Sequence, residues 1–323
     1  MRKSVVESYP QLWHYTTGPG LHGILTSQQI WATNILYLND AEEFTGFFDH
    51  KLLALLKDGV REGLEARKSS DEVVRAIDEA GGIEGFVNIF SSQFLDNLRT
   101  NTLNLKAYIT SFCYTPSAPG SEDGLLSQWR GYGVDGGYAI VFDTQGLNDL
   151  LHDEKNRFFY SYRCLSAVDY HDCDTGKLEE ARDWENAIRK TVAHIIHKQP
   201  QNPAEALYEP LVSLATRHKH RGFREECEVR IAVVTLPRDN PRKAGDNRPE
   251  KQVYFNKQLG GGLVPYIALF ERATGEAAKL PIKKIIVGPH PEKLKRQKAI
   301  EILLDQLEIE AKVVVSDIPY IGR

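Results

Sequence analysis

Two carboxylates and an arginine alternate in the segment Glu226-Cys227-Glu228-Val229-Arg230. Alternate side chains of a strand share a face, so Glu226, Glu228 and Arg230 are expected on one face. Carboxylates at this spacing lie about 7 Å apart and repel each other unless an arginine or a ligand compensates them. One interpretation is a carboxylate aimed at a substrate, with neighbours that tune its pKa. The other is a solvated outer face with a Glu–Arg ladder, and the pattern favours neither.

The segment His14-Tyr15-Thr16 near the start of the chain could also do chemistry. In a strand, His14 and Thr16 point to one side and Tyr15 to the other. The pair could line a cleft with hydrogen-bonding groups. A histidine satisfied at the edge of a sheet is the commoner occurrence, and the tripeptide alone favours it.

Aromatic residues, glycines and one guanidinium gather in the stretch SQWRGYG, residues 127–133. A planar heterocycle could stack on Trp129 or Tyr132, and Arg130 could hold a phosphate through two hydrogen bonds. A loop anchored by its aromatic side chains explains the same residues equally well.

The sequence lacks the patterns typical of metal sites and of several large enzyme classes. His194 and His197 could share a helical face, but no third ligand accompanies them. The chain has no P-loop, no nucleophile elbow and no dinucleotide-binding glycine motif. Its four cysteines are scattered without a C-x-x-C pair. We therefore expect no metal, reduced thiols and a cytoplasmic protein.

Composition describes an ordinary globular protein of one large domain or two smaller ones. The chain has 323 residues, of which 41% are hydrophobic and 26% charged, and its net charge is −4. That balance gives no strong positive field that would collect nucleic acid. No apolar run reaches the length of a membrane span, so no membrane partner is expected.

Periodicity and turn signals predict a mixture of strands and helices. Residues 41–105 read as a helical insertion. Strands are expected at 13–17, 30–33, 107–113, 138–142, 163–170, 228–235, 284–287 and 311–316, with a further strand or bridge at 35–38. Helices are expected at 21–27, 184–198, 207–217 and 291–307. Because the two types do not alternate regularly, the pattern favours a single α+β domain over residues 1–323.

Taken in order, these segments resemble a widespread bacterial family of uncharacterised domains. The family's pattern is L-x-H-Y-T, L-N-D-x-x-E, a Ser-Phe strand, W-x-x-Y-G, G-x-x-I-x-F, E-x-E-x-R and I-x-x-I-I-x-G. This chain carries it at Leu12–Thr16, Leu38–Glu43, Ser111-Phe112, Trp129–Gly133, Gly137–Phe142, Glu226–Arg230 and Ile282–Gly288. The resemblance covers nearly the whole chain. Ala41 departs from it where a proline often follows Asn-Asp, which affects only the entry to a helix.

The first half of that family is similar to the ADP-ribosyltransferase superfamily, which has an H-x-T strand early and a strand-borne glutamate much later. The resemblance implies a split mixed β-sheet with a helical insertion, and NAD as the substrate. It implies that His14 and Thr16 hold the NAD ribose and that Ser111 or Tyr132 supports the nicotinamide end. Glu228 or Glu226 would bond the ribose 2′-hydroxyl as the catalytic residue. The remaining residues expected to bind NAD are Tyr15, Trp129, Arg130 and Arg230.

We therefore expect an NAD-consuming enzyme that transfers ADP-ribose to a protein or nucleic acid, for example in bacterial phage defence, or that hydrolyses NAD. Breaking the nicotinamide–ribose bond creates an oxocarbenium-like centre, which a nearby carboxylate stabilises. The alternative is a non-enzymatic sensor that binds a nucleotide or a peptide. A hydrolase or nuclease is a third hypothesis, and only the carboxylate pair supports it. The acceptor and the oligomeric state are left open by the sequence.

Overall fold

The computed structural model describes residues 4–38, 52–66, 71–103, 106–115, 121–171, 186, 189–192, 196, 212–213, 216–235, 246–257, 262–271 and 279–319. The chain divides into two compact units. The first comprises Met1–Tyr37, Ala107–Val168 and Gly222–Arg323, and the second comprises Leu38–Lys106 and Asp169–Arg221. The second unit contains the whole stretch that we predicted as a helical insertion and adds residues 169–221 to it. The prediction of a single domain is not tested by this division.

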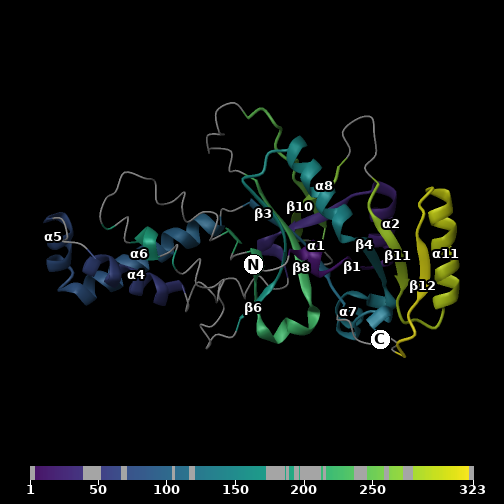
Figure 1. Cartoon of the computed structure of the whole chain (residues 1–323), viewed down its shortest axis with the longest axis horizontal. Helices are drawn as coiled ribbons and strands as arrows, with labels where there is room; N and C mark the ends of the chain where they lie inside the picture. Colours follow the sequence, from purple (N-terminus) through teal and green to yellow (C-terminus); the bar gives the residue numbers. More distant parts are fainter. Residues whose placement is uncertain are drawn as a thin grey trace. The chain divides into compact units, whose positions relative to one another are not determined.

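A ten-stranded mixed sheet organises the first unit, which confirms the predicted α+β class. Its path is β12 (Lys312–Val315), β11 (Ile282–Val287), β4 (Tyr138–Asp143), β1 (Gln11–Thr16), β3 (Lys106–Cys113), β2 (Ile30–Asn34), β10 (Leu263–Leu269) and β9 (Tyr254–Lys257). Two further strands, β8 (Glu228–Thr235) and β5 (Tyr162–Ala167), pair with each other, and β8 also pairs with β3. Strands β11 and β12 run parallel beside α11 (Lys293–Gln306) (Figure 1).

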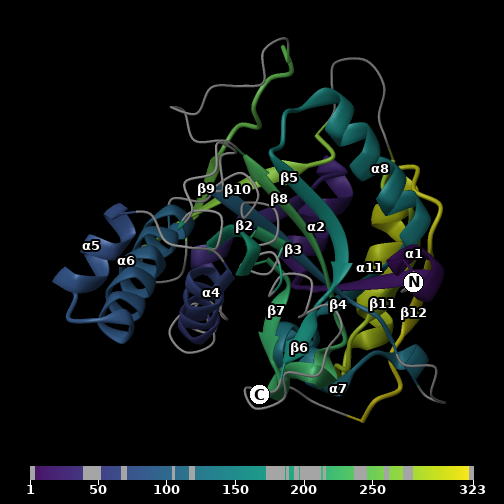
Figure 2. The same ribbon diagram turned by 60° about the vertical axis from the view of Figure 1, so that its left-hand side comes forward.

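Strand β3 is the branch point of this sheet. It pairs with β2 at Tyr108 and Ile109, with β1 at Cys113, and also with β8. Since a strand has only two edges, the sheet must divide at β3. Strands β2, β10 and β9 accordingly lie on one side of β3, and β4, β11 and β12 on the other (Figure 2).

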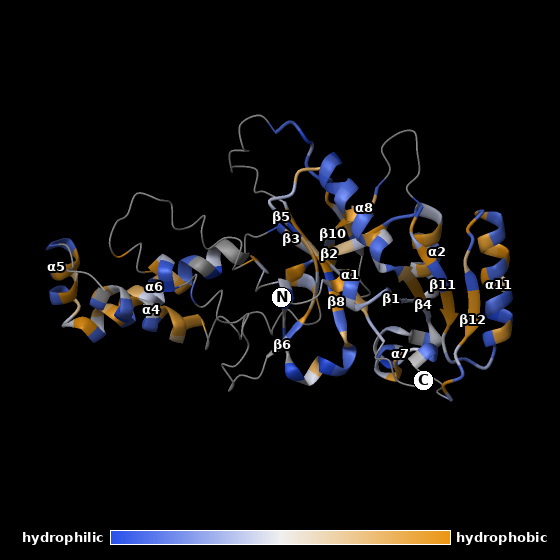
Figure 3. Ribbon diagram, in the orientation of Figure 1, coloured by the Kyte–Doolittle hydropathy of each residue, from blue (hydrophilic) through white to orange (hydrophobic). Residues whose placement is uncertain are grey.

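Alternation along the strands gives the sheet two faces with separate cores. Leu12, Phe112 and Val229 belong to a large core that also contains residues of α2 (Gly18–Ser27), α8 (Thr144–Arg157) and α11. Trp13 and Cys113 pack on the other side with Trp129 of α7 (Leu126–Tyr132). We call these sides the α2 face and the α7 face. Figure 3 shows β11 and much of β8 in the hydrophobic colour, as expected of strands covered on both sides.

Most predicted strands are present with small changes in their ends, and three local predictions differ from the structure. Residues 35–38 form no strand, because Ile35–Tyr37 is the 3₁₀ helix η1. The stretch interpreted as an aromatic loop is helix α7. Helix α8 was not predicted, because its N-cap Asp143 is also the last residue of β4; the Asp143 carboxylate accepts from the Gly146 amide at 2.9 Å.

The second unit is mainly helical in its described part. It contains α4 (Leu53–Ala66), α5 (Asp71–Glu79), α6 (Ile83–Leu103) and the short parallel pair β6 (Asp169–His171) and β7 (His218–His220). Its core is formed by apolar residues that recur at helical spacing, namely Leu52, Leu56, Val60, Val87, Leu95, Val192 and Ile196.

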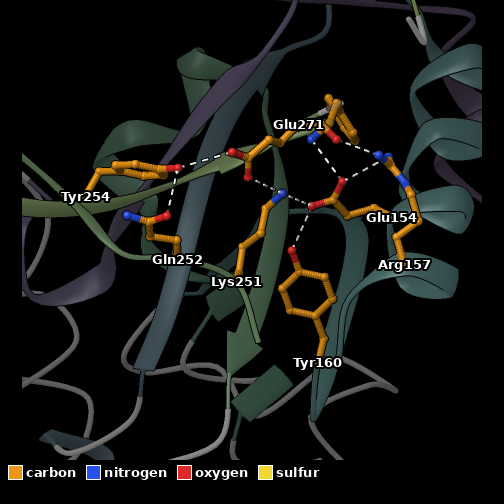
Figure 4. Close-up of polar contacts among 8 residues, drawn as sticks. Glu154, Arg157, Tyr160, Lys251, Gln252, Tyr254 and Glu271 are labelled. Atoms are coloured by element: carbon orange, nitrogen blue, oxygen red, sulfur yellow. Dashed lines mark hydrogen bonds and ion pairs between the residues drawn. The ribbon is translucent and has the colours of Figure 1, made fainter. Parts of the chain in front are cut away.

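A buried ion cluster fixes the segment that leads into β9 (Figure 4). The Lys251 ammonium lies 2.8 Å from Glu154 Oε1 and 3.2 Å from Glu271 Oε2. Glu154 also accepts hydrogen bonds from the Tyr160 hydroxyl at 2.9 Å and the Phe270 amide at 3.1 Å. Because the Lys251 ammonium is paired with two carboxylates, and Glu154 accepts further hydrogen bonds, the cluster has the character of a structural clamp.

Candidate functional site

The division of the sheet exposes one residue in the middle of its central strand. Ser111 of β3 is exposed, although Thr110 and Phe112 on either side of it are buried. It lies between the stretch that pairs with β2, at Tyr108 and Ile109, and the residue that pairs with β1, Cys113. We call this place on β3, between the residues that pair with β2 and the residue that pairs with β1 and centred on Ser111, the fork.

His14 bonds the fork through its side chain rather than its backbone. Its Nδ1 lies 2.9 Å from the Ser111 carbonyl oxygen. A carbonyl can only accept, so Nδ1 donates, and Nε2 of the neutral ring is an acceptor. Burial lowers the pKa of the imidazole, which the Ser111 bond offsets only in part. Near neutral pH the fork therefore presents an uncharged histidine, and Nε2 has no hydrogen-bond partner among the described residues.

Strand β8 brings the late carboxylates to the same end of β3. The Tyr114 amide, next to the end of β3, donates to the Cys227 carbonyl at 2.9 Å, and Glu228 follows directly. Strands β1 and β8 are both neighbours of β3. Their backbones are therefore at most two strand spacings apart, about 10 Å. The early and late segments that we predicted to form one site are thus close along the sheet.

Glu228 and Arg230 form a buried ion pair, which rules out the interpretation of a solvated outer face on this strand. All eight residues of β8 are buried. Arg230 Nε lies 2.7 Å from Glu228 Oε1, and Nη2 lies 3.2 Å from Oε2. Both side chains are about 5% exposed or less. Each carboxylate oxygen therefore already accepts a charged donor, so the pair compensates itself without a ligand.

Glu226 does not continue the alternation of β8, contrary to the sequence prediction. It ends the 3₁₀ helix η5 (Arg221–Glu226), and Cys227 between the two glutamates has a φ of 48°. This left-handed residue turns the chain, so Glu226 and Glu228 no longer share a strand face. Glu226 is half-buried, and it is the more accessible of the two predicted catalytic carboxylates.

The two faces of the sheet also separate His14 from Glu228. Leu12 and Val229 both pack in the core of the α2 face, so the alternating residues His14 and Thr16 start from that face. Glu228 and Arg230 alternate with Val229 and project from the α7 face, as Ser111 does. The ring of His14 reaches the Ser111 carbonyl across the fork. Ser111, Glu228 and Arg230 therefore project from the same face of the sheet. His14 starts from the other face, and its link to the fork is the hydrogen bond to the Ser111 carbonyl.

Two predicted aromatic contacts with a ligand are corrected by burial. Trp129 is 1% exposed, its Nε1 donates to the Asp123 carbonyl at 3.0 Å, and its ring packs edge-on against Tyr15. The Tyr15 hydroxyl accepts from the Leu125 amide at 2.8 Å. Both rings are covered by protein, so neither offers a face for stacking. Arg130 and Tyr132 lie exposed on α7.

An aromatic ladder that the sequence reading overlooked lies on the strands beside the fork. Trp31 of β2 stacks on Tyr266 of β10 with ring centres 4.2 Å apart, and Tyr266 stacks on Tyr254 of β9 at 5.6 Å. Trp31 is 49% exposed. A sequence signal was available, because Trp31 alternates with the apolar residues Ile30 and Ala32 of a short strand and so had to face away from their core.

Several other residues singled out in the sequence lie outside the described part of the chain, and metal sites and membrane-spanning helices were not expected. Asn39, Asp40 and Glu43 lie outside the part that the structure describes, as do His194 and His197. Within that part, no group of three or more metal-binding side chains is found. The described helices also include none with the length and apolar character needed to cross a membrane.

Comparison with known proteins gives one family match. Residues 128–231 match the family model described as "Protein of unknown function (DUF2971)". The matched stretch runs from the start of α7 through β4 and β5 into β8, and it includes Glu226, Glu228 and Arg230. No curated protein and no solved structure matches the chain significantly. The similarity to ADP-ribosyltransferases stays a prediction.

Proposed function

We propose that this protein is an NAD-consuming enzyme that transfers ADP-ribose to a macromolecular acceptor. The observation that carries the proposal is the fork, where the His14 imidazole bonds the Ser111 carbonyl beside the start of β8. A neutral imidazole whose Nδ1 is committed offers Nε2 to a ribose hydroxyl. The exposed Ser111 gives a ligand access to the middle of the sheet.

Glu226 is the better candidate for the catalytic carboxylate. Both oxygens of Glu228 are held by Arg230, whereas Glu226 is half-buried at the turn before β8. In the proposed reaction, nicotinamide leaves with the electrons of the C1′–N bond, and the Glu226 carboxylate stabilises the positive charge on the ribose. The acceptor then bonds C1′ and gives up its proton. The Glu228–Arg230 pair fixes the strand that positions Glu226.

The first experiment measures nicotinamide release from NAD by the purified full-length protein. Glu226→Gln should lower the rate about a hundredfold or more, because the amide cannot stabilise the developing charge as a carboxylate does. Its unfolding temperature, measured beside the rate, distinguishes loss of the carboxylate from loss of the fold.

Glu225→Gln is the matched control, because Glu225 is an exposed carboxylate one residue away. It should leave the rate unchanged. A Glu226→Gln protein that releases nicotinamide at the natural rate removes Glu226 from the mechanism. Absence of release by the natural protein with protein and nucleic-acid acceptors contradicts the proposed activity as a whole.

The buried Glu228–Arg230 pair favours a second candidate function, a non-enzymatic nucleotide sensor. The Glu228 carboxylate, one of the two expected to be catalytic, is paired with Arg230 inside the fold. A protein that binds a nucleotide without turnover needs no free carboxylate at this position. Such a sensor is stabilised thermally by its ligand while releasing no nicotinamide, and the stabilisation is the same in Glu226→Gln. Turnover that depends on Glu226 excludes this second candidate.

A further inference from the structure

The aromatic ladder Trp31–Tyr266–Tyr254 is a stacked surface with one open end. The rings of Trp31 and Tyr266 are inclined by 27°, and those of Tyr266 and Tyr254 by 28°. Tyr266 therefore covers one side of the indole, while Trp31 remains 49% exposed. A planar ring that binds to the exposed side of Trp31 would extend a stack that already exists.

The ladder lies on the same face of the sheet as Ser111. Ile30 and Ala32 pack in the core of the α2 face, so Trp31 projects from the α7 face. Thr33 pairs with Ile109, and continuing that antiparallel register places Trp31 level with Ser111 at the fork. Within the described part of the first unit, α7 packs on this face against β1.

The ladder is held firmly from its far end. The Tyr254 hydroxyl donates to Glu271 Oε1 at 3.1 Å, and the other oxygen of Glu271 contacts the Lys251 ammonium. That ammonium is completely buried between Glu271 and Glu154 (Figure 4). A platform fixed in this way loses little conformational entropy when a ring stacks on it.

We propose that Trp31 is the stacking surface for the heterocyclic base of a nucleotide whose sugar reaches the fork. The inference rests on the proposed function and assigns this position to the adenine end of the NAD donor. The register continued from Thr33 and Ile109 places Trp31 level with Ser111 on the neighbouring strand, so one or two strand spacings, about 5–10 Å, separate the base and sugar sites. That span suits a single nucleoside. The net charge of −4 gives no track for a polynucleotide.

Binding of AMP to the full-length protein, followed by calorimetry, tests the platform directly. Trp31→Ala should raise the Kd for AMP about tenfold or more, because base–aromatic stacking contributes that much or more to binding. Trp31→Phe keeps an aromatic ring and should restore most of the affinity. Phe255→Ala is the matched control: Phe255 is 63% exposed on β9 but points to the other face than Tyr254, so AMP should bind as before.

Several results overturn the proposal. One is that the natural protein binds neither AMP nor ADP-ribose at millimolar concentration. Another is that Trp31→Ala binds AMP as tightly as the natural protein does. A third is that Phe255→Ala weakens AMP binding as much as Trp31→Ala does. Tight binding of a single-stranded oligonucleotide without binding of AMP also contradicts it.

The platform and the enzymatic proposal fail in different ways. If AMP binding depends on Trp31 but nicotinamide is never released, the platform stands and the enzyme does not. If nicotinamide is released and Trp31→Ala leaves KM for NAD unchanged, the enzyme stands and the platform does not.

Discussion

A single hydrogen bond determines what His14 can do at the fork. Its Nδ1 is committed to the Ser111 carbonyl, and burial lowers the pKa of the ring. The neutral form therefore carries both the structural bond and the proposed contact with ribose. Sequence patterns identified this histidine, but the Ser111 carbonyl that orients it is a backbone group, which no residue-type pattern could indicate.

The lowered pKa of His14 predicts a loss of stability in mild acid. Because the folded-state pKa lies below the unfolded value of about 6.5, the unfolded chain binds more protons between the two values. The contribution of His14 is complete above about pH 6.5 and declines as the pH falls toward the folded-state pKa. In His14→Gln, thermal unfolding from pH 8 to 5 should show a smaller decline. His22→Gln, at an exposed position of α2, should keep the natural slope; equal slopes in all three proteins contradict the prediction.

Among the elements, β8 shows how one backbone angle changes the meaning of a motif. The alternation of Glu226, Glu228 and Arg230 predicted one polar face, and the strand was indeed found at its predicted bounds, Glu228–Thr235. The left-handed Cys227 removes Glu226 from that face. The remaining pair, Glu228 and Arg230, is buried, and β8 is paired on both edges, with β3 and with β5.

Substitutions at Cys227 test this turn. Its φ of 48° is allowed for glycine but strained for a β-branched residue. Cys227→Val should lower the free energy of unfolding in urea by about 1–3 kcal/mol, whereas Cys227→Gly should change it by less than about 1 kcal/mol. Cys164→Val, in the regular strand β5, should be well tolerated. Equal stability of the two Cys227 variants would falsify the role of the turn.

At the scale of the whole molecule, buried charge joins segments that are distant in the sequence. Glu154 of α8, Lys251 before β9 and Glu271 after β10 meet in one cluster (Figure 4). No sequence pattern pairs residues about a hundred positions apart, so this cluster could not be predicted. It holds the β9 end of the ladder in place.

Removing the buried cation should cost more stability than removing a surface one. Lys251→Met leaves the fully buried Glu154 without its nearest cation and should lower the free energy of unfolding by about 3–5 kcal/mol. Adding Glu154→Gln should recover part of the loss. Lys298→Met breaks only an exposed pair with Glu301 and should cost about 1 kcal/mol or less. Urea unfolding of the four proteins gives the comparison, and a similar loss in both lysine variants argues against the clamp.

The sequence by itself determined much of the local structure: most strands, though not β7, β9 and β10, several helices, the α+β class, and His14, Ser111 and the two late glutamates as residues of interest. Side-chain periodicity and turn residues act over a few positions, so they can be read directly. Only the tertiary structure decided that Glu228 is buried against Arg230, that Trp129 and Tyr15 are covered, and that Trp31 is exposed beside the fork. Burial and strand pairing depend on which distant segments meet, and a local pattern carries no information about those partners.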